Sequence, residues 1–349
     1  MGAMVDWQLA GKVAEGVAAL QPSGDAAPFQ ALVRPADEAE QLVSGYTGLK
    51  PLAGALPVAE SVDRAAWVEA NLRSMRGVLE PAAAKAATRL GGLGGVVGPA
   101  AGAVLAVEAG AISGFLAGRV LGQYEFPVLD PEAPARLLFV APNLGHAVET
   151  LDAEAEQLLR WVALHEITHA LQFGGVPWLR GHLAGMVVEL TNALDLDPTK
   201  LFSGIPGLDD LRGLVDAVRE GGIATVVLGT DRRALMDSVQ AFMAVLEGYA
   251  EHVMDAVGAE VIDDLPRLRE ALERRRADRT GLLRLFEKLI GMDMKLRQYE
   301  QGKRFCDRVV ERAGIAGLNR VWESPDRMPT LGELDDPAGW LARTEPAAA

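Results

Sequence analysis

The chain contains one short pattern whose residue types and spacing suit a metal ion, His165-Glu-Ile-Thr-His169. Histidines four residues apart lie on one face of a helix, so both imidazoles can bind the same ion. This is the H-E-x-x-H pattern of zinc sites. Glu166 would lie beside the open coordination position, where it can take a proton from water. We therefore predict a zinc ion bound by His165 and His169, with Glu166 as the general base.

The helix that would carry this pattern is largely apolar. Leu158 and Val162 continue the stripe that holds the two histidines. Polar groups in such a helix are costly unless they have partners. The alternative to a metal is a pair of hydrogen-bonded core histidines. Glu166 would then be a third buried polar group to satisfy, so the pattern favours metal binding.

The third ligand must come from another part of the chain. An extended pattern with a third histidine would need glycine and histidine where the sequence has Gln172 and Gly175. We favour Glu247, because it follows an unbroken apolar run, 241–246, where a carboxylate is costly unless it is paired or bound to metal. Gly248 would let this helix approach the His165 helix closely. The alternative ligands are isolated histidines: His146, His182 and His252.

Residues near Glu247 could support the reaction. Glu251 lies one turn later and could orient a ligand histidine through its other ring nitrogen. His252 lies about 140° around the helix from Glu247, so the two cannot both face one ion. A hydrolytic site also needs a group that stabilises the oxyanion. The sequence leaves Tyr249, Tyr299 and His252 open for that role.

The elements that position these residues are predicted to be mainly α-helical, with a small sheet (α+β). Residues 136–141 should form a short buried strand that ends in a turn at 142–145 and lies at the sheet edge beside the H-E-x-x-H helix. That helix should be capped by Asp152 and run to Phe173. The stretch 195–207 should be a loop, and the tail from Trp322 an extended arm. Further helices are predicted at 208–220, 231–257, 264–277, 280–291 and 293–313.

Residues 90–118 form a glycine-rich apolar stretch. Small residues recur every fourth position and would allow close helix contacts, at Gly98, Gly102, Ala106, Gly110, Gly114, Gly118 and Gly122. The length could span a bilayer, which leaves a membrane-embedded enzyme as an alternative. Because the flanks lack aromatic and Lys/Arg anchors in the usual pattern, we expect a buried central helix and no stable membrane insertion.

The 349 residues should form one intertwined unit of two halves, 1–175 with the H-E-x-x-H helix and 176–349 with the third ligand. A formal net charge of −14 argues against nucleic-acid binding, which needs a basic surface. Cys306 is the single cysteine, so the chain has no internal disulfide, and we expect a cytoplasmic location. Cys306 itself should be a small buried side chain.

The order of these motifs resembles the glutamate-ligand branch of the zincin metallopeptidases. It is more closely similar to a bacterial family of zincin-like metallopeptidases, most of them uncharacterised. The resemblance rests on Asp6-Trp7, Asp63-Arg64 with Trp67, 120–124, 165–169, 246–255, 297–302 and Trp340. It implies a zincin-like fold and a peptide or protein substrate hydrolysed at zinc. The alternative function is a non-catalytic helical scaffold or regulatory protein that the metal only stabilises.

Overall fold

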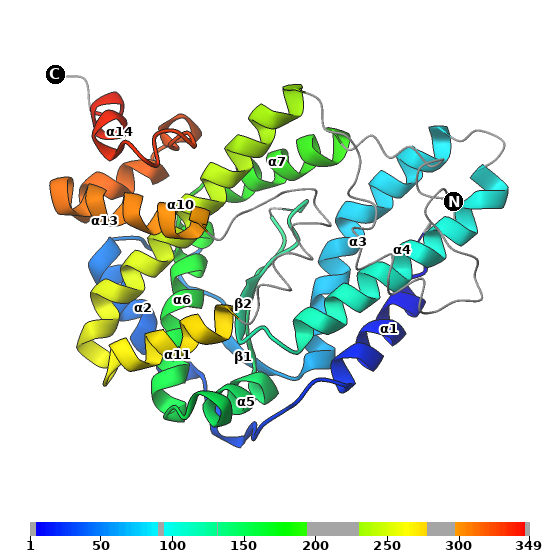
Figure 1. The fold of residues 1–349 in the computed structure, drawn as a ribbon, viewed down its shortest axis with the longest axis horizontal. Coiled ribbons are helices and arrows are strands. Elements are labelled where there is room, and N and C mark those ends of the chain that lie inside the picture. The colour runs from blue at the N-terminus through cyan, green and yellow to red at the C-terminus, as the bar shows by residue number, and fades with distance from the viewer. Residues whose placement is uncertain (1–4, 90–93, 131, 194–229, 278–296, 346–349) are drawn as a thin grey trace.

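The structure is a computed structural model that describes residues 5–89, 94–130, 132–193, 230–277 and 297–345 (Figure 1). It is mostly helical and holds one three-stranded sheet, which confirms the predicted mainly α class. The predicted loop at 195–207 and the predicted helices at 208–220 and 280–291 lie outside the described residues.

The sheet consists of β1 (Ala59–Val62), β2 (Gly122–Glu125) and β3 (Arg136–Val140), in the order β1-β3-β2. β1 is parallel to β3, with Ala59 opposite Leu137, and β2 is antiparallel to β3, with Gly122 opposite Phe139. The predicted strand therefore exists, but it is central and not an edge strand. Its run of apolar residues fits burial on both faces.

Successive side chains of β3 face two different hydrophobic cores. Leu137 and Phe139 belong to the core that contains the H-E-x-x-H helix. Leu138 and Val140 belong to a second core, formed with the N-terminal helices. The period of two along a strand thus places the sheet between two helical layers, which are seen on its two sides in Figure 1.

One layer contains α1 (Trp7–Ala19), α3 (Arg64–Arg89) and α4 (Gly94–Ala117). α4 packs on α1, where Gly110 and Gly114 lie against the backbone carbonyls of Ala10 and Ala14. The predicted central helix is thus part of an outer layer, and it ends before Gly122, which lies in β2. In the described part of the chain, no helix combines the length and the apolar character that crossing a bilayer requires.

The other layer contains the H-E-x-x-H helix. Its helices are α2 (Val33–Thr47), α5 (Ala141–Leu151), α6 (Ala155–Gly175), α7 (Leu179–Ala193), α10 (Thr230–Val261), α11 (Leu265–Ala277) and α13 (Arg297–Leu318). The predicted turn at 142–145 is the first part of α5, because Pro142 suits the start of a helix. Asp152 does not cap α6; it ends α5 with a left-handed φ of 49°.

The C-terminal tail is folded and not an extended arm. Short 3₁₀ turns at Asn319–Trp322 and Pro325–Arg327 lead to α14 (Pro337–Arg343). Trp340 of α14 is fully buried, and its ring packs edge-on against Phe305 of α13. A large aromatic side chain buries enough apolar area to hold such a tail against the body of the protein.

Candidate metal centre

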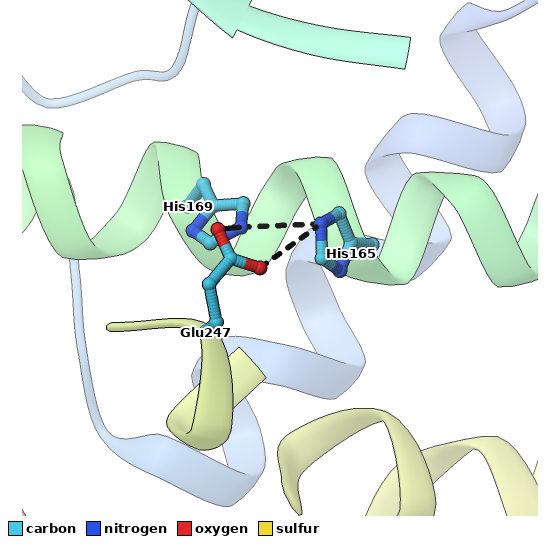
Figure 2. A group of neighbouring side chains, drawn as sticks. All are labelled: His165, His169 and Glu247. Atoms are coloured by element: carbon cyan, nitrogen blue, oxygen red, sulfur yellow. Dashed lines mark hydrogen bonds and ion pairs between the residues drawn. The ribbon is translucent and has the colours of Figure 1, made fainter. Parts of the chain in front are cut away.

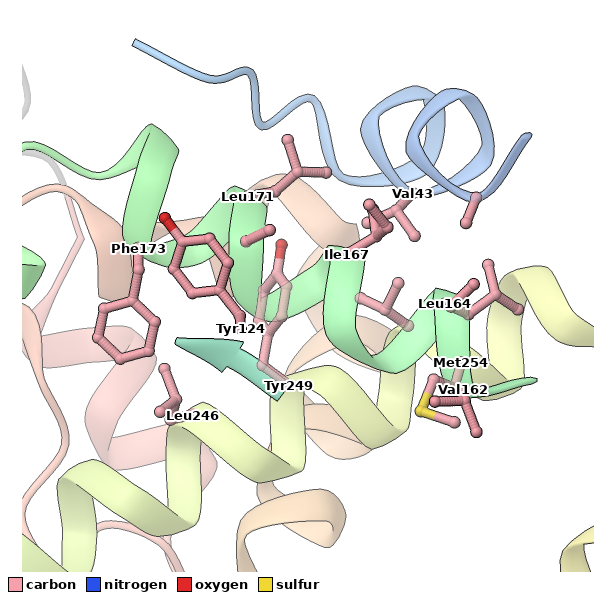
Figure 3. Close-up of a cluster of buried hydrophobic side chains, with 14 of the residues drawn as sticks. Val43, Tyr124, Val162, Leu164, Ile167, Leu171, Phe173, Leu246, Tyr249 and Met254 are labelled. Carbon is pink, nitrogen blue, oxygen red and sulfur yellow. The ribbon is translucent and has the colours of Figure 1, made fainter. Parts of the chain in front are cut away.

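The two histidines of the pattern lie on α6, which is buried between β2, α2 and α10 (Figure 3). α6 ends at Gly175, because Val176 precedes a proline and adopts an extended conformation, with φ −105° and ψ 110°. The imidazoles of His165 and His169 meet at right angles, with their Nε2 atoms 3.2 Å apart. The helix therefore presents both nitrogens to one point.

Glu247 of α10 completes the group (Figure 2). Its Oε1 lies 3.7 Å from Nε2 of His169, and its Oε2 lies 4.0 Å from Nε2 of His165. The three potential ligand atoms all lie within 4.8 Å of one another, and no other such group occurs among the described residues. The three were predicted from sequence as metal ligands, and the fold brings them together from α6 and α10.

The donor set fits a zinc ion. Two imidazole nitrogens and one carboxylate leave a fourth, open position, as in catalytic zinc sites. Ligand atoms around a tetrahedral zinc are about 3.3 Å apart when the bonds are about 2.0–2.1 Å. The 3.2 Å between His165 and His169 meets that value, and a small movement of Glu247 would bring its carboxylate to it.

Glu247 is less buried than its apolar sequence context suggested. Its side chain keeps 26% of its exposure, whereas the preceding Leu246 is buried. The sequence predicts that Gly248 clears space for α6, but the structure gives this glycine a different partner. A Cβ at Gly248 would meet the backbone of Gly302 and Lys303, so this glycine serves the crossing of α10 with α13.

Glu166 lies on α6 with its carboxylate against the sheet. Oε2 accepts a hydrogen bond of 2.9 Å from the backbone amide of Tyr124, in the edge strand β2. Burial raises the pKa of Glu166 to about 7, although His169 and the Tyr124 amide act in the opposite direction. A carboxylate with such a pKa is poised to accept and return a proton near neutral pH.

β2 is thus the strand beside α6, and sequence reasoning had assigned this place to residues 136–141. Gly122 of β2 was interpreted as a member of the glycine strip and, within 120–124, as part of the family resemblance. A Cβ at Gly122 would lie 2.7 Å from Cγ of Glu166 and 2.9 Å from Cγ1 of Val162. This glycine therefore allows the strand to approach Glu166, the predicted general base.

The sequence profile of the zincin-like metallopeptidase family matches residues 5–341. The chain belongs to this family. A crystal structure from Chloroflexus aurantiacus, described as a "putative hydrolase with a novel fold", aligns over 99% of this chain and 100% of the other. The TM-score is 0.71 and the sequence identity 27%. No curated protein matches the chain.

Gln172 is a residue of this zincin-like site that sequence reasoning missed. It follows His169 by one turn, and its Oε1 lies 2.8 Å from Nδ1 of His169. Its Nε2 donates to the carbonyl oxygen of Leu246 at 3.1 Å. The signal was a polar residue in the apolar run of α6, three residues after a ligand.

His165, the other predicted ligand histidine, has different neighbours. The ring of Trp161 is parallel to that of His165, with an interplanar angle of 2°. Nδ1 of His165 lies 3.3 Å from the sulfur of Met254. Glu251, predicted to orient a ligand histidine, has its Oε2 3.6 Å from the guanidinium of Arg269. The orientation of a ligand histidine by Glu251 stays a prediction.

The alternative histidine ligands do not join the group. Both ring nitrogens of His252 have protein partners, Tyr46 and Asp307, each at 2.8 Å. His182 packs edge-on against Trp178, and burial lowers its pKa. The metal-binding group found among the described residues includes neither of these, nor His146.

The three residues predicted as candidates for oxyanion stabilisation have different surroundings from one another. The hydroxyl of Tyr249 is buried and donates to Oδ1 of Asn319 at 2.8 Å. His252 is engaged by Tyr46 and Asp307. The side chain of Tyr299 lies outside the described residues. Cys306 is buried, as predicted, and burial raises the pKa of its thiol.

Proposed function

We propose that this protein is a zinc-dependent hydrolase that cleaves peptide bonds. In this proposal His165, His169 and Glu247 bind the zinc ion, and Glu166 is the general base. The observation that carries the proposal is the convergence of three ligand atoms from α6 and α10 beside a buried glutamate. Membership of the zincin-like metallopeptidase family supports zinc and a peptide substrate.

A zinc ion at this site would act as a Lewis acid and lower the pKa of water. Glu166 supplies the proton transfer. Because its Oε2 is held by the amide of Tyr124, Oε1 is the atom that accepts a proton from the attacking water. The same carboxyl group then returns the proton to the leaving nitrogen.

A peptide substrate is supported by the position of β2. Among the strands of the described residues, β2 has β3 on one side only and is an edge of the sheet. Edge strands bind extended peptides by adding them as a further strand. Since β2 also lies against Glu166, a peptide bound along this edge would pass close to the general base and the metal ligands.

The test compares wild-type protein with Glu166→Gln. Both should bind one zinc ion per chain, measured by elemental analysis after dialysis. Hydrolysis of a diverse peptide mixture, followed by mass spectrometry, should fall by about 10²–10⁴-fold or more in the variant, because only proton transfer is lost. Equal cleavage by both proteins would remove Glu166 as the base. Zinc binding without any cleavage by the wild type would favour the non-catalytic scaffold.

A further inference from the structure

Gln172 is fully buried, although its side chain carries a polar amide. Both ends of the amide have a partner. Oε1 lies 2.8 Å from Nδ1 of His169 on the same helix, and Nε2 lies 3.1 Å from the carbonyl oxygen of Leu246 on α10. A buried amide with both ends satisfied is held in one orientation, because rotation would leave two polar groups unpaired.

The partners decide which way the amide points. A carbonyl oxygen can only accept, so the NH₂ group of Gln172 must face Leu246. Oε1 then faces His169 and can only accept, so Nδ1 of that ring must carry a proton. A histidine with its proton on Nδ1 keeps the lone pair of Nε2 for a metal ion. Nε2 is the nitrogen that faces His165 and Glu247.

The second hydrogen bond reaches the other helix of the site. Leu246 directly precedes Glu247, so Gln172 connects the ring of one ligand to the backbone that carries another. We propose that Gln172 is a positioning residue of the metal centre. It fixes the tautomer and ring orientation of His169, and it sets α10 against α6 so that Glu247 meets the two histidines. The proposal rests on the proposed metal site.

A purely structural role for Gln172 predicts something different. Loss of a buried hydrogen bond would then lower the stability of the protein and leave its zinc affinity unchanged. Thr168 provides the matched control. It is also fully buried on α6, and its hydroxyl donates to the carbonyl oxygen of Leu164 at 2.7 Å, within its own helix. Thr168→Val removes a buried hydrogen bond on the same helix and leaves the hydrogen bonds of the ligand side chains in place.

The experiment measures the affinity of the full-length protein for zinc alone, by competition with a chelator. Gln172→Met keeps the side-chain volume and removes both hydrogen bonds. We expect its zinc Kd to rise by about 10–100-fold, the range for loss of a group that orients a ligand. Thr168→Val should stay within about 3-fold of wild type, even where thermal unfolding shows that it is less stable.

Gln172→Glu separates the two proposed effects of Gln172, which are the orientation of the His169 ring and the placement of α10 against α6. Its carboxylate can accept from Nδ1 of His169 but cannot donate to Leu246, so its zinc Kd should lie between those of wild type and Gln172→Met. A Kd no better than that of Gln172→Met would contradict the orienting role. In the zinc-bound wild type, the hydrogen-bonded Nδ1 proton of His169 should give a slowly exchanging imidazole NMR signal that Gln172→Met lacks.

Two results would overturn the proposal. One is wild-type zinc affinity in Gln172→Met, and the other is an equal loss of affinity in Thr168→Val. The first shows that the amide does not position the ligands, and the second shows that any lost buried hydrogen bond on α6 has the same effect. If the wild-type protein binds no zinc, the proposed function fails as well. If it binds zinc and Gln172→Met binds equally, only the positioning role is wrong.

Discussion

The backbone amide of Tyr124 donates to Oε2 of Glu166 at 2.9 Å, which ties the edge strand of the sheet to the proposed general base. In the proposed mechanism this bond leaves Oε1 as the atom for proton transfer. Because the amide belongs to the backbone, the orientation of Glu166 depends on how closely β2 approaches α6. Gly122, two residues earlier in the strand, permits that approach.

Gly122→Ala should therefore impair hydrolysis. The added Cβ would lie 2.7 Å from Cγ of Glu166, so the carboxylate or the strand must shift. A displaced catalytic group costs on the order of 10²-fold in rate. Zinc affinity should stay close to that of wild type, because the atoms nearest to the added Cβ belong to Glu166 and Val162 and not to a proposed ligand. The rate is measured on any peptide that the wild type cleaves, with zinc content as the second readout.

Gln123→Ala is the control for the strand itself. The side chain of Gln123 points to the opposite face, where its amide pairs with that of Asn71 at 3.2 Å. This variant should cleave within a few-fold of wild type. Wild-type rates in Gly122→Ala would show that Glu166 tolerates the shift, and the role given to this glycine would be wrong.

Glu247→Ala should lose zinc. It removes a direct ligand, so the Kd should rise by more than the roughly 10–100-fold expected for an orienting group. His252→Ala should bind zinc almost normally but unfold more easily, by about 1–3 kcal/mol, because Tyr46 and Asp307 each lose a hydrogen bond to the ring, although Asp307 keeps Lys303. Chelator competition and urea unfolding on both variants check the pair. Loss of zinc binding in His252→Ala, with zinc binding kept in Glu247→Ala, would make His252 the ligand.

Acid should weaken the junction of α10, α11 and α13 through Asp255. Burial alone would raise the pKa of Asp255, but hydrogen bonds from Arg269 and Lys303 outweigh it and lower that pKa. The unfolded value is about 3.9. A lowered folded pKa gives stability that is fully present above the unfolded value and is lost as the pH falls through the folded one.

Asp255→Asn should therefore destabilise the protein most near neutral pH, and the difference from wild type should shrink below about pH 4. Urea unfolding at pH 7 and pH 3 measures the difference. Asp335→Asn, at an exposed position, serves as the control and should show a similar difference at both values. A constant difference for Asp255→Asn would mean that its carboxylate gains nothing from Arg269 and Lys303.

Gly248→Ala should destabilise the crossing of α10 and α13. The new methyl group would meet the backbone of Gly302 and Lys303, which cannot move aside as a flexible side chain could. Overpacking of this kind costs about 1–3 kcal/mol. Gly185→Ala, in an exposed part of α7 with open space around it, should be neutral or stabilising by up to about 1 kcal/mol. Urea unfolding that ranks the two variants equally would contradict the packing argument.

The sequence alone was sufficient for the features that depend on local periodicity. The spacing of His165 and His169 placed both rings on one helical face, and the apolar run before Glu247 marked a carboxylate in need of a partner. The same periodicity located the helices near 155–175, 230–261 and 265–277 within a few residues. The mainly α class followed from these helical periods.

Only the tertiary structure decided which elements meet. Strand order comes from long-range pairing, so residues 136–140 became the central strand and 122–125, of which only Gly122 was interpreted as part of a glycine strip, became the edge beside Glu166. Gly248 was seen correctly as a close-contact residue, but its partner is Gly302 and not the His165 helix.

Gln172 shows the same division between local pattern and long-range contact. Its place one turn after His169 is fixed by the sequence, whereas its second partner, the carbonyl oxygen of Leu246, lies 74 positions away in the chain. A periodic pattern tells which face of a helix a residue occupies. Which backbone lies opposite that face depends on how all the helices pack, and packing is a property of the whole fold.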